Sequence, residues 1–138
     1  MGDVQKAKDL AITLEDRPGT FAKAAEAIAK AGINIEGFCA VEEGGRGTLH
    51  VLTTDDAGTR RALESQGFKV SETKDVFIVK AEDRPGFLAN ILRKVADQEI
   101  NVGLSYTATN SRIVMSAENA EQLRQVLEEV SRTAGSRN

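Results

Sequence analysis

The sequence predicts an α+β fold in which two βαββαβ modules follow one another, residues 1–74 and residues 75–138. The first observation is a repeat: Glu-Asp-Arg-Pro-Gly occupies residues 15–19 and returns at residues 82–86, an offset of 67 residues. The second is that Ile-Asn follows each copy at the same distance, at residues 33–34 and 100–101. The third is that strand-like and helix-like apolar spacings alternate in the same order in both halves. Self-similarity at a fixed period indicates a repeated structural unit.

The first half predicts four strands and two helices. In chain order these are a strand at 10–14, a helix at 18–31, strands at 33–41 and 48–54, a helix at 56–66 and a short strand at 68–74. Pro18 suits the first turn of its helix, and Gly32 ends that helix with a left-handed residue. The glycine-rich segment 42–47 joins two strands as a hairpin, and the pair Asp55-Asp56 suits the cap of the second helix.

The second half repeats this order until its last element. The expected elements are strands at 77–81, 100–107 and 112–117, and helices at 88–95 and 123–130. Residues 131–138 contain one apolar residue, Ala134, so we expect no fourth strand there. An uncovered sheet edge is a liability that proteins usually cover. We therefore expect a strand from the first module, or from a second chain, to lie beside the strand that contains Phe77.

Composition excludes several classes of function. The net charge is −3, aromatic residues make up 4% of the chain, and there is no Trp, so a basic or base-stacking nucleic-acid surface is not expected. No apolar run reaches membrane-spanning length, and the N-terminus has no apolar signal core, which favours the cytoplasm and no membrane partner. Cys39 and His50 each lack a neighbour of metal-ligand spacing. We expect no metal, no cofactor and no catalytic residue.

The repeated Asp-Arg-Pro-Gly loop, followed by Ile-Asn-Ile or Ile-Asn-Val at the start of the next strand, resembles the ACT domain. Over residues 15–35 and 82–102, 9 of 21 positions are identical, and the resemblance covers nearly the whole chain in tandem. It implies two ferredoxin-like modules with antiparallel sheets and helices on one face. It also implies an allosteric regulatory protein that binds an amino acid at the junction of paired modules. The partners it implies are a small-molecule amino acid, a second copy of the chain in a homodimer and an enzyme of amino-acid metabolism.

The candidate ligand-binding residues lie at the loop, at the helix start and at the asparagine of each copy. They are Asp16, Gly19, Thr20, Phe21 and Asn34 in the first module and Asp83, Gly86, Phe87, Leu88 and Asn101 in the second. A helix start offers free N–H groups and a positive dipole end to a carboxylate, and glycine permits close backbone approach. An aspartate accepts from an ammonium group, and an asparagine binds either end of a zwitterion.

Each of these residues also has a structural interpretation. Asp16 and Asp83 suit helix caps, Asn34 and Asn101 suit turn positions, and the Pro-Gly pairs suit loop architecture. The two copies differ, since Thr20 corresponds to Phe87 and Gly37 to Leu104. The larger residues predict a filled pocket in the second module, so we expect the first module to leave more room for a ligand.

Three functions follow as hypotheses. The preferred one is a non-catalytic amino-acid sensor that regulates amino-acid metabolism. The second is a ligand-independent protein–protein interaction module that regulates a partner enzyme. The third is a small acylphosphatase-like enzyme using Arg17 and Asn34, which is disfavoured because the Gly- and Val-rich phosphate loop of that family is absent. Fold alone does not decide among them.

Overall fold

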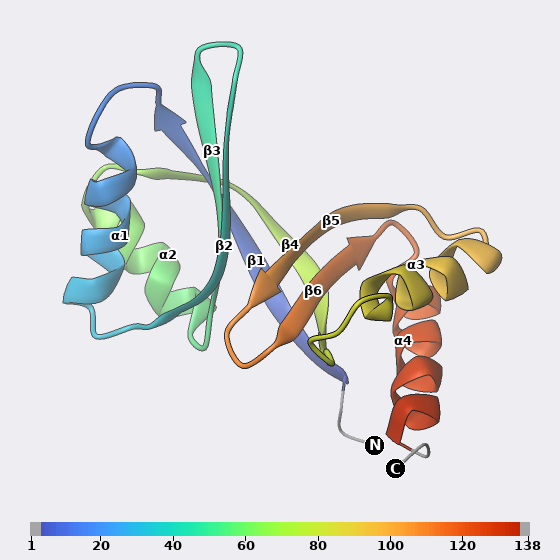
Figure 1. Cartoon of the computed structure of the whole chain (residues 1–138). Helices are drawn as coiled ribbons and strands as arrows, with labels where there is room; N and C mark the ends of the chain where they lie inside the picture. The colour runs from blue at the N-terminus through green and yellow to red at the C-terminus, as the bar shows by residue number, and fades with distance from the viewer. Residues whose placement is uncertain (1–3, 136–138) are drawn as a thin grey trace. The chain divides into compact units, whose positions relative to one another are not determined.

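A computed structural model describes residues 4–135, which form six strands and four helices (Figure 1). The elements are β1 Val4–Glu15, α1 Thr20–Lys30, β2 Ile35–Glu43, β3 Arg46–Thr53, α2 Asp56–Ser65, β4 Lys69–Lys80, α3 Phe87–Asp97, β5 Val102–Ala108, β6 Arg112–Ala117 and α4 Ala120–Gly135. All four predicted helices are present. The predicted strands at 68–74 and 77–81 are one continuous strand, β4.

The expectation of two tandem ferredoxin-like modules, each with its own antiparallel sheet and helices on one face, is wrong. The six strands of residues 4–135 instead form one sheet in the order β1-β3-β2-β5-β6-β4, which closes into a barrel. The prediction failed because β1 and β4 are longer than the strands that the apolar patterns indicated. β1 and β4 have 12 residues each, whereas the apolar patterns predicted strands of five to seven residues. A closed sheet leaves no unpaired edge, so the liability of an open edge is removed.

The chain divides into two compact units. The N-terminal unit is Lys8–Lys74, and the C-terminal unit comprises the described residues 4–7 and 75–135. Each of the long strands, β1 and β4, contributes residues to both units.

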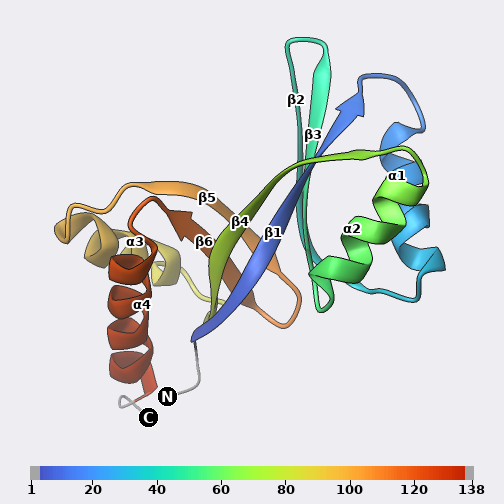
Figure 2. The same cartoon turned by 180° about the vertical axis from the view of Figure 1, so that it is seen from behind.

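In the N-terminal unit, β3 pairs with β1 and with β2, both antiparallel, so that Val51 lies opposite Leu10 and Phe38. Helices α1 and α2 contact each other, and they lie side by side in both views (Figures 1 and 2). Of the predicted pair Asp55-Asp56, Asp55 caps α2, because its carboxylate accepts from the N–H of Gly58 at 2.9 Å. The core consists of Leu10, Ile12, Leu14, Ala24, Ala27, Ile28, Leu49, Val51 and Leu63.

In the C-terminal unit, β6 pairs antiparallel with β4 and β5, and α3 contacts α4 (Figure 2). Val4 packs against the core of this unit, and the ammonium of Lys6 lies 3.7 Å from the Asp75 carboxylate. These contacts support the hypothesis that a strand from the first half completes the sheet that contains Phe77. The core consists of Phe77, Val79, Phe87, Ile91, Val95, Ile100, Ile113, Met115, Leu123, Leu127 and Val130.

The last segment of the chain agrees with the absence of a fourth strand as far as it is described. Residues 131–135 belong to α4, and residues 136–138 lie outside the described residues.

Candidate functional site

The first copy of the repeated pentapeptide is a tight loop between β1 and α1. The N–H of Arg17 donates to the carbonyl of Glu15 at 2.9 Å, which turns the chain as the strand ends. Gly19 then adopts φ 93°, in the left-handed region, and α1 begins at Thr20. Glycine is needed at this position because a side chain strains a left-handed backbone. The Pro-Gly pair thus sets the angle at which the helix leaves the loop.

Thr20 secures this loop from inside the helix. Its side chain is buried, and its hydroxyl lies 2.8 Å from the Glu15 carbonyl and 3.2 Å from the Arg17 carbonyl, which share its proton. Asp16 does not cap α1, because no side chain makes a cap hydrogen bond at that helix start. The capping interpretation of Asp16 is therefore wrong, and its exposed carboxylate is left available.

The helix start retains free donors. The N–H of Lys23 donates to the carbonyl of Gly19 at 2.9 Å, and the N–H of Thr20 makes a long contact, 3.4 Å, with the carbonyl of Arg17. Among the described residues, the N–H groups of Phe21 and Ala22 have no acceptor, as expected for the first turn of a helix.

The second copy reproduces this geometry with different side chains. Gly86 has φ 89°, no side chain caps α3, and the N–H of Asn90 donates to Gly86 at 2.9 Å. Asp83 is exposed, and because no side chain caps α3 it is not a helix cap either. Phe87 takes the place of Thr20 and is buried, and the guanidinium of Arg84 lies 5.5 Å from the centre of its ring. Arg84 also donates to the Glu82 carboxylate at 2.5 Å.

A cavity of about 630 Å³ adjoins the first loop in the N-terminal unit. Its lining is rich in charge: Arg17, Lys23, Arg46 and Lys69 are cationic, and Glu15 and Asp16 are anionic. Thr20, Gln66, Phe68 and neighbouring backbone complete it. Of the predicted residues of this module, Asp16 and Thr20 line the cavity, whereas Gly19, Phe21 and Asn34 do not.

A second cavity, of about 790 Å³, adjoins the repeated loop of the C-terminal unit. Its lining includes Asp83 and Arg84 from the loop, Phe87, Leu88 and Leu92 from α3, and residues 105–108 of β5. Of the predicted residues, Asp83, Phe87 and Leu88 line it, and Gly86 and Asn101 do not. The expectation that Phe87 and Leu104 fill this space is wrong, since Phe87 forms a wall and Leu104 is not part of the lining.

The two asparagines lie at the starts of their strands. Asn34 is exposed one residue before β2, and Asn101 is exposed one residue before β5. This position agrees with the turn interpretation, and their role in ligand contact stays a prediction.

Sequence reasoning missed much of each cavity wall. Lys23, Arg46 and Lys69 lie on three separate elements, and no local motif connects them. In the C-terminal unit, Leu92 and Ser105 lie on α3 and β5. Their counterparts at the 67-residue offset, Ala25 and Phe38, do not line the first cavity, so the repeat carries no signal for them.

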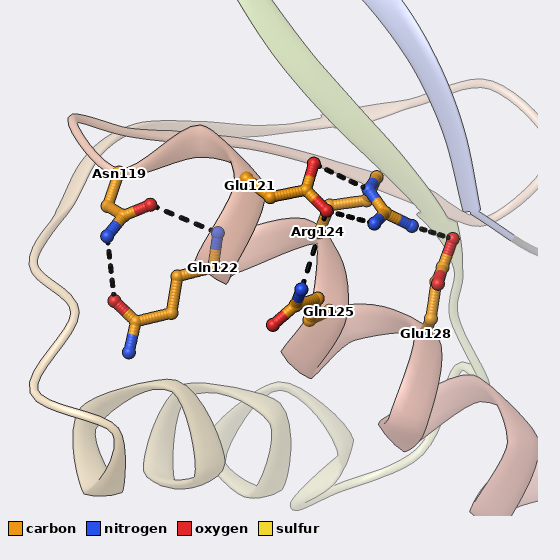
Figure 3. A network of polar contacts seen from close by, with 6 residues as sticks. All are labelled: Asn119, Glu121, Gln122, Arg124, Gln125 and Glu128. Atoms are coloured by element: carbon orange, nitrogen blue, oxygen red, sulfur yellow. Dashed lines mark hydrogen bonds and ion pairs between the residues drawn. The ribbon is translucent and has the colours of Figure 1, made fainter.

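Two polar clusters lie outside the cavities. His50 Nδ1 is 2.8 Å from an Asp9 carboxylate whose side chain is 2% exposed, which agrees with a packed histidine. On α4, Arg124 binds Glu121 and Glu128, and the Asn119 side chain accepts from the N–H of Gln122 (Figure 3). This network stabilises the first turns of α4.

None of the helices within residues 4–135 has the length and hydropathy of a membrane-spanning segment. The same residues contain no group of three or more His, Cys, Asp or Glu side chains placed to hold a metal ion.

No protein-family model matches this chain, and neither does any curated protein. Solved structures do match. Protein BT0572 from Bacteroides thetaiotaomicron is 27% identical with a TM-score of 0.82, over 93% of this chain and 90% of that chain. The ligand-free regulatory subunit of aspartate kinase from Thermus thermophilus is 21% identical with a TM-score of 0.61, over 91% of this chain and 93% of that one.

A longer protein shares the same fold in part. E. coli aspartokinase III, solved in complex with lysine and aspartate, is 15% identical with a TM-score of 0.52, over 93% of this chain and 32% of that chain. At these identities the aspartate kinase structures show a common fold alone. They support the resemblance to the ACT domain at the level of fold.

Proposed function

We propose that this protein is a non-catalytic regulator that senses an amino acid and controls an enzyme of amino-acid metabolism. The observation that carries the proposal is that both copies of the repeated loop adjoin a cavity: residues 15–17 line one, and residues 82–84 line the other. Both volumes fall within the range of about 300–1,000 Å³ typical of small-molecule sites.

The chemistry of the loops suits a zwitterion. Each loop presents an exposed aspartate beside an arginine, so opposite charges are available for an ammonium group and a carboxylate. The similarity to regulatory subunits of aspartate kinase supports the same assignment, since those proteins are subunits of an enzyme of amino-acid metabolism. The proposal includes Asp16, Thr20, Asp83, Phe87 and Leu88 as ligand contacts, and it includes a homodimer in the cytoplasm.

A ligand would act by stabilising one arrangement of the protein over another. Its effect is bounded by its difference in affinity for the two arrangements. A coupling free energy of about 1–3 kcal/mol is sufficient for a working switch.

The test is a thermal-shift screen of the full chain against the twenty amino acids, with size-exclusion chromatography of every hit. A ligand at about 100 times its Kd adds about 2.7 kcal/mol to the free energy of unfolding, which raises Tm by several degrees. We expect one or two amino acids to do so, and we expect Asp16→Ala or Asp83→Ala to abolish the shift. Asp97→Ala is the matched control, because Asp97 is an exposed helical aspartate outside both cavities.

A second candidate function is the ligand-independent interaction module. Phe21, Phe38 and Val41 are 40%, 54% and 50% exposed in the N-terminal unit. Exposed apolar side chains of this size are typical of protein-binding surfaces. A screen in which no amino acid at millimolar concentration moves Tm would reject the sensor and favour this function.

A further inference from the structure

We propose that the cavity of the C-terminal unit is specific for amino acids with a large apolar side chain, such as leucine, isoleucine, methionine or phenylalanine. The inference rests on the proposed function and assigns the ligand class of one of its two sites.

The two copies of the repeat differ at two positions that affect the size of this cavity. At the 67-residue offset, Phe21 and Phe38 of the N-terminal unit correspond to Leu88 and Ser105. The rings of Phe21 and Phe38 contact each other, with centroids 5.7 Å apart. Leu88 and Ser105 instead line the cavity. Exchange of an aromatic ring for a serine on β5 therefore makes room where the N-terminal unit has a ring–ring contact.

Ser105 contributes space and no free donor. Its hydroxyl donates to the carbonyl of Val114 at 2.9 Å, across the β5–β6 pair. A serine hydroxyl has one proton, so Ser105 has no further donor for a ligand.

Several of the side chains that line this cavity are apolar. Phe87, Tyr106 and Ile113 are buried and form part of the lining. Leu88 and Leu92, on the exposed face of α3, are 48% and 37% exposed. An apolar side chain placed against them removes apolar surface from water, which is favourable. A charged side chain placed against Leu88 and Leu92 gains no polar partner from either of them.

Charged side chains also line this cavity. Asp83 and Arg84 line the cavity together with Arg112, so both an acceptor for an ammonium group and donors for a carboxylate are present. Arg84 is positioned by its bond to Glu82 and by its place over the Phe87 ring. The polar groups therefore suit the part that all amino acids share, and the apolar wall selects the side chain.

The cavity of the N-terminal unit has the opposite character. Its four cationic side chains, Arg17, Lys23, Arg46 and Lys69, outnumber the two anionic ones, so the lining favours an anionic group over an apolar one. An apolar amino acid is thus expected to bind in the cavity of the C-terminal unit in preference to that of the N-terminal unit.

The experiment is isothermal titration calorimetry of the full chain with leucine, isoleucine, methionine and phenylalanine, and with aspartate and lysine for comparison. We expect the apolar amino acids to bind. Ser105→Phe, which restores the residue type of the N-terminal copy, is expected to raise their Kd at least tenfold. Ser71→Phe is the matched control and is expected to leave Kd within twofold. Ser71 is also an exposed strand serine whose hydroxyl donates to a backbone carbonyl, that of Ala11, and it lines neither cavity.

A second variant tests the wall independently. Leu92→Glu places a carboxylate on a partly exposed face of α3 and is expected to raise Kd at least tenfold as well. If aspartate or lysine binds and the apolar amino acids do not, or if Ser105→Phe and Leu92→Glu leave Kd unchanged, the inference is overturned while the sensor function stands. If none of the twenty amino acids binds, both are overturned.

Discussion

Gly19 and Gly86 hold backbone angles that other residues adopt only under strain. Their φ angles are 93° and 89°, and the space where a Cβ would lie is open in both cases. A substitution at either position therefore acts through the backbone alone, without a steric clash.

We expect Gly86→Ala to lower the free energy of unfolding by about 1–2 kcal/mol, the cost of a left-handed conformation for a residue with a Cβ. Chemical denaturation measures this change. Gly103→Ala is the control, because Gly103 lies in β5 with an ordinary φ and its Cβ would meet only the Ser116 hydroxyl, at 3.7 Å. Equal losses in the two variants would contradict the backbone explanation.

For single residues, the sequence predicted the loop between β1 and α1 better than it predicted the role of each side chain. Pro-Gly after a strand is a local signal, so the turn and the start of α1 were predictable. No side chain caps α1, whose N-cap is Gly19, and the Thr20 hydroxyl holds the loop by donating to the Glu15 carbonyl. The contact made by Thr20 depends on the burial of its side chain, which the local pattern does not specify.

Among the helices, α4 is stabilised by a polar network on its first turns (Figure 3). The hydrogen bond from Arg124 lowers the pKa of Glu121, with a smaller opposing contribution from desolvation. Its hydrogen bonds to Glu121 and Glu128 raise the pKa of Arg124 itself. The ionised pair is therefore the stable form of this network.

This network predicts a pH dependence. Because the pKa of Glu121 is lowered in the folded state, its contribution to stability is present above the pKa of an unfolded glutamate, about 4.3. That contribution is lost as pH falls through the lowered pKa. We expect Glu121→Gln to lower the urea midpoint at pH 7, and we expect this effect to shrink as the pH falls through the lowered pKa, where wild type loses the charge as well. Glu26→Gln, an exposed change on α1, is the control that should lack this pH dependence.

The elements themselves were largely predictable because their apolar periods differ and their ends carry glycine or aspartate. Asp55 and Gly32 are such signals, and both behave as predicted. Strand length was not predictable, since residues 4–9 and 71–75 are mostly polar and half exposed. Their strand conformation depends on pairing with distant segments, which a local pattern does not reveal.

For the molecule as a whole, residues 4–7 belong to a unit that otherwise begins at Asp75. We expect Val4→Asp to destabilise the C-terminal unit by about 1–3 kcal/mol, because Val4 packs against its core and an unpaired carboxylate there loses hydration. Hydrogen exchange of the β4 and β6 amides would measure the loss. Gln5→Asp is the matched control, since Gln5 is exposed. It is expected to change the free energy of opening measured by hydrogen exchange by less than about 0.5 kcal/mol.

The shared β1 strand makes the covalent order of the chain differ from its order in space. A fragment ending at Lys74 carries residues that belong to the other unit, and a fragment beginning at Asp75 lacks them. The fragment that ends at Lys74 nevertheless contains the whole N-terminal unit, Lys8–Lys74, whereas the fragment that begins at Asp75 is incomplete. Division of the chain at the midpoint of the repeat therefore leaves one unit whole and removes part of the other.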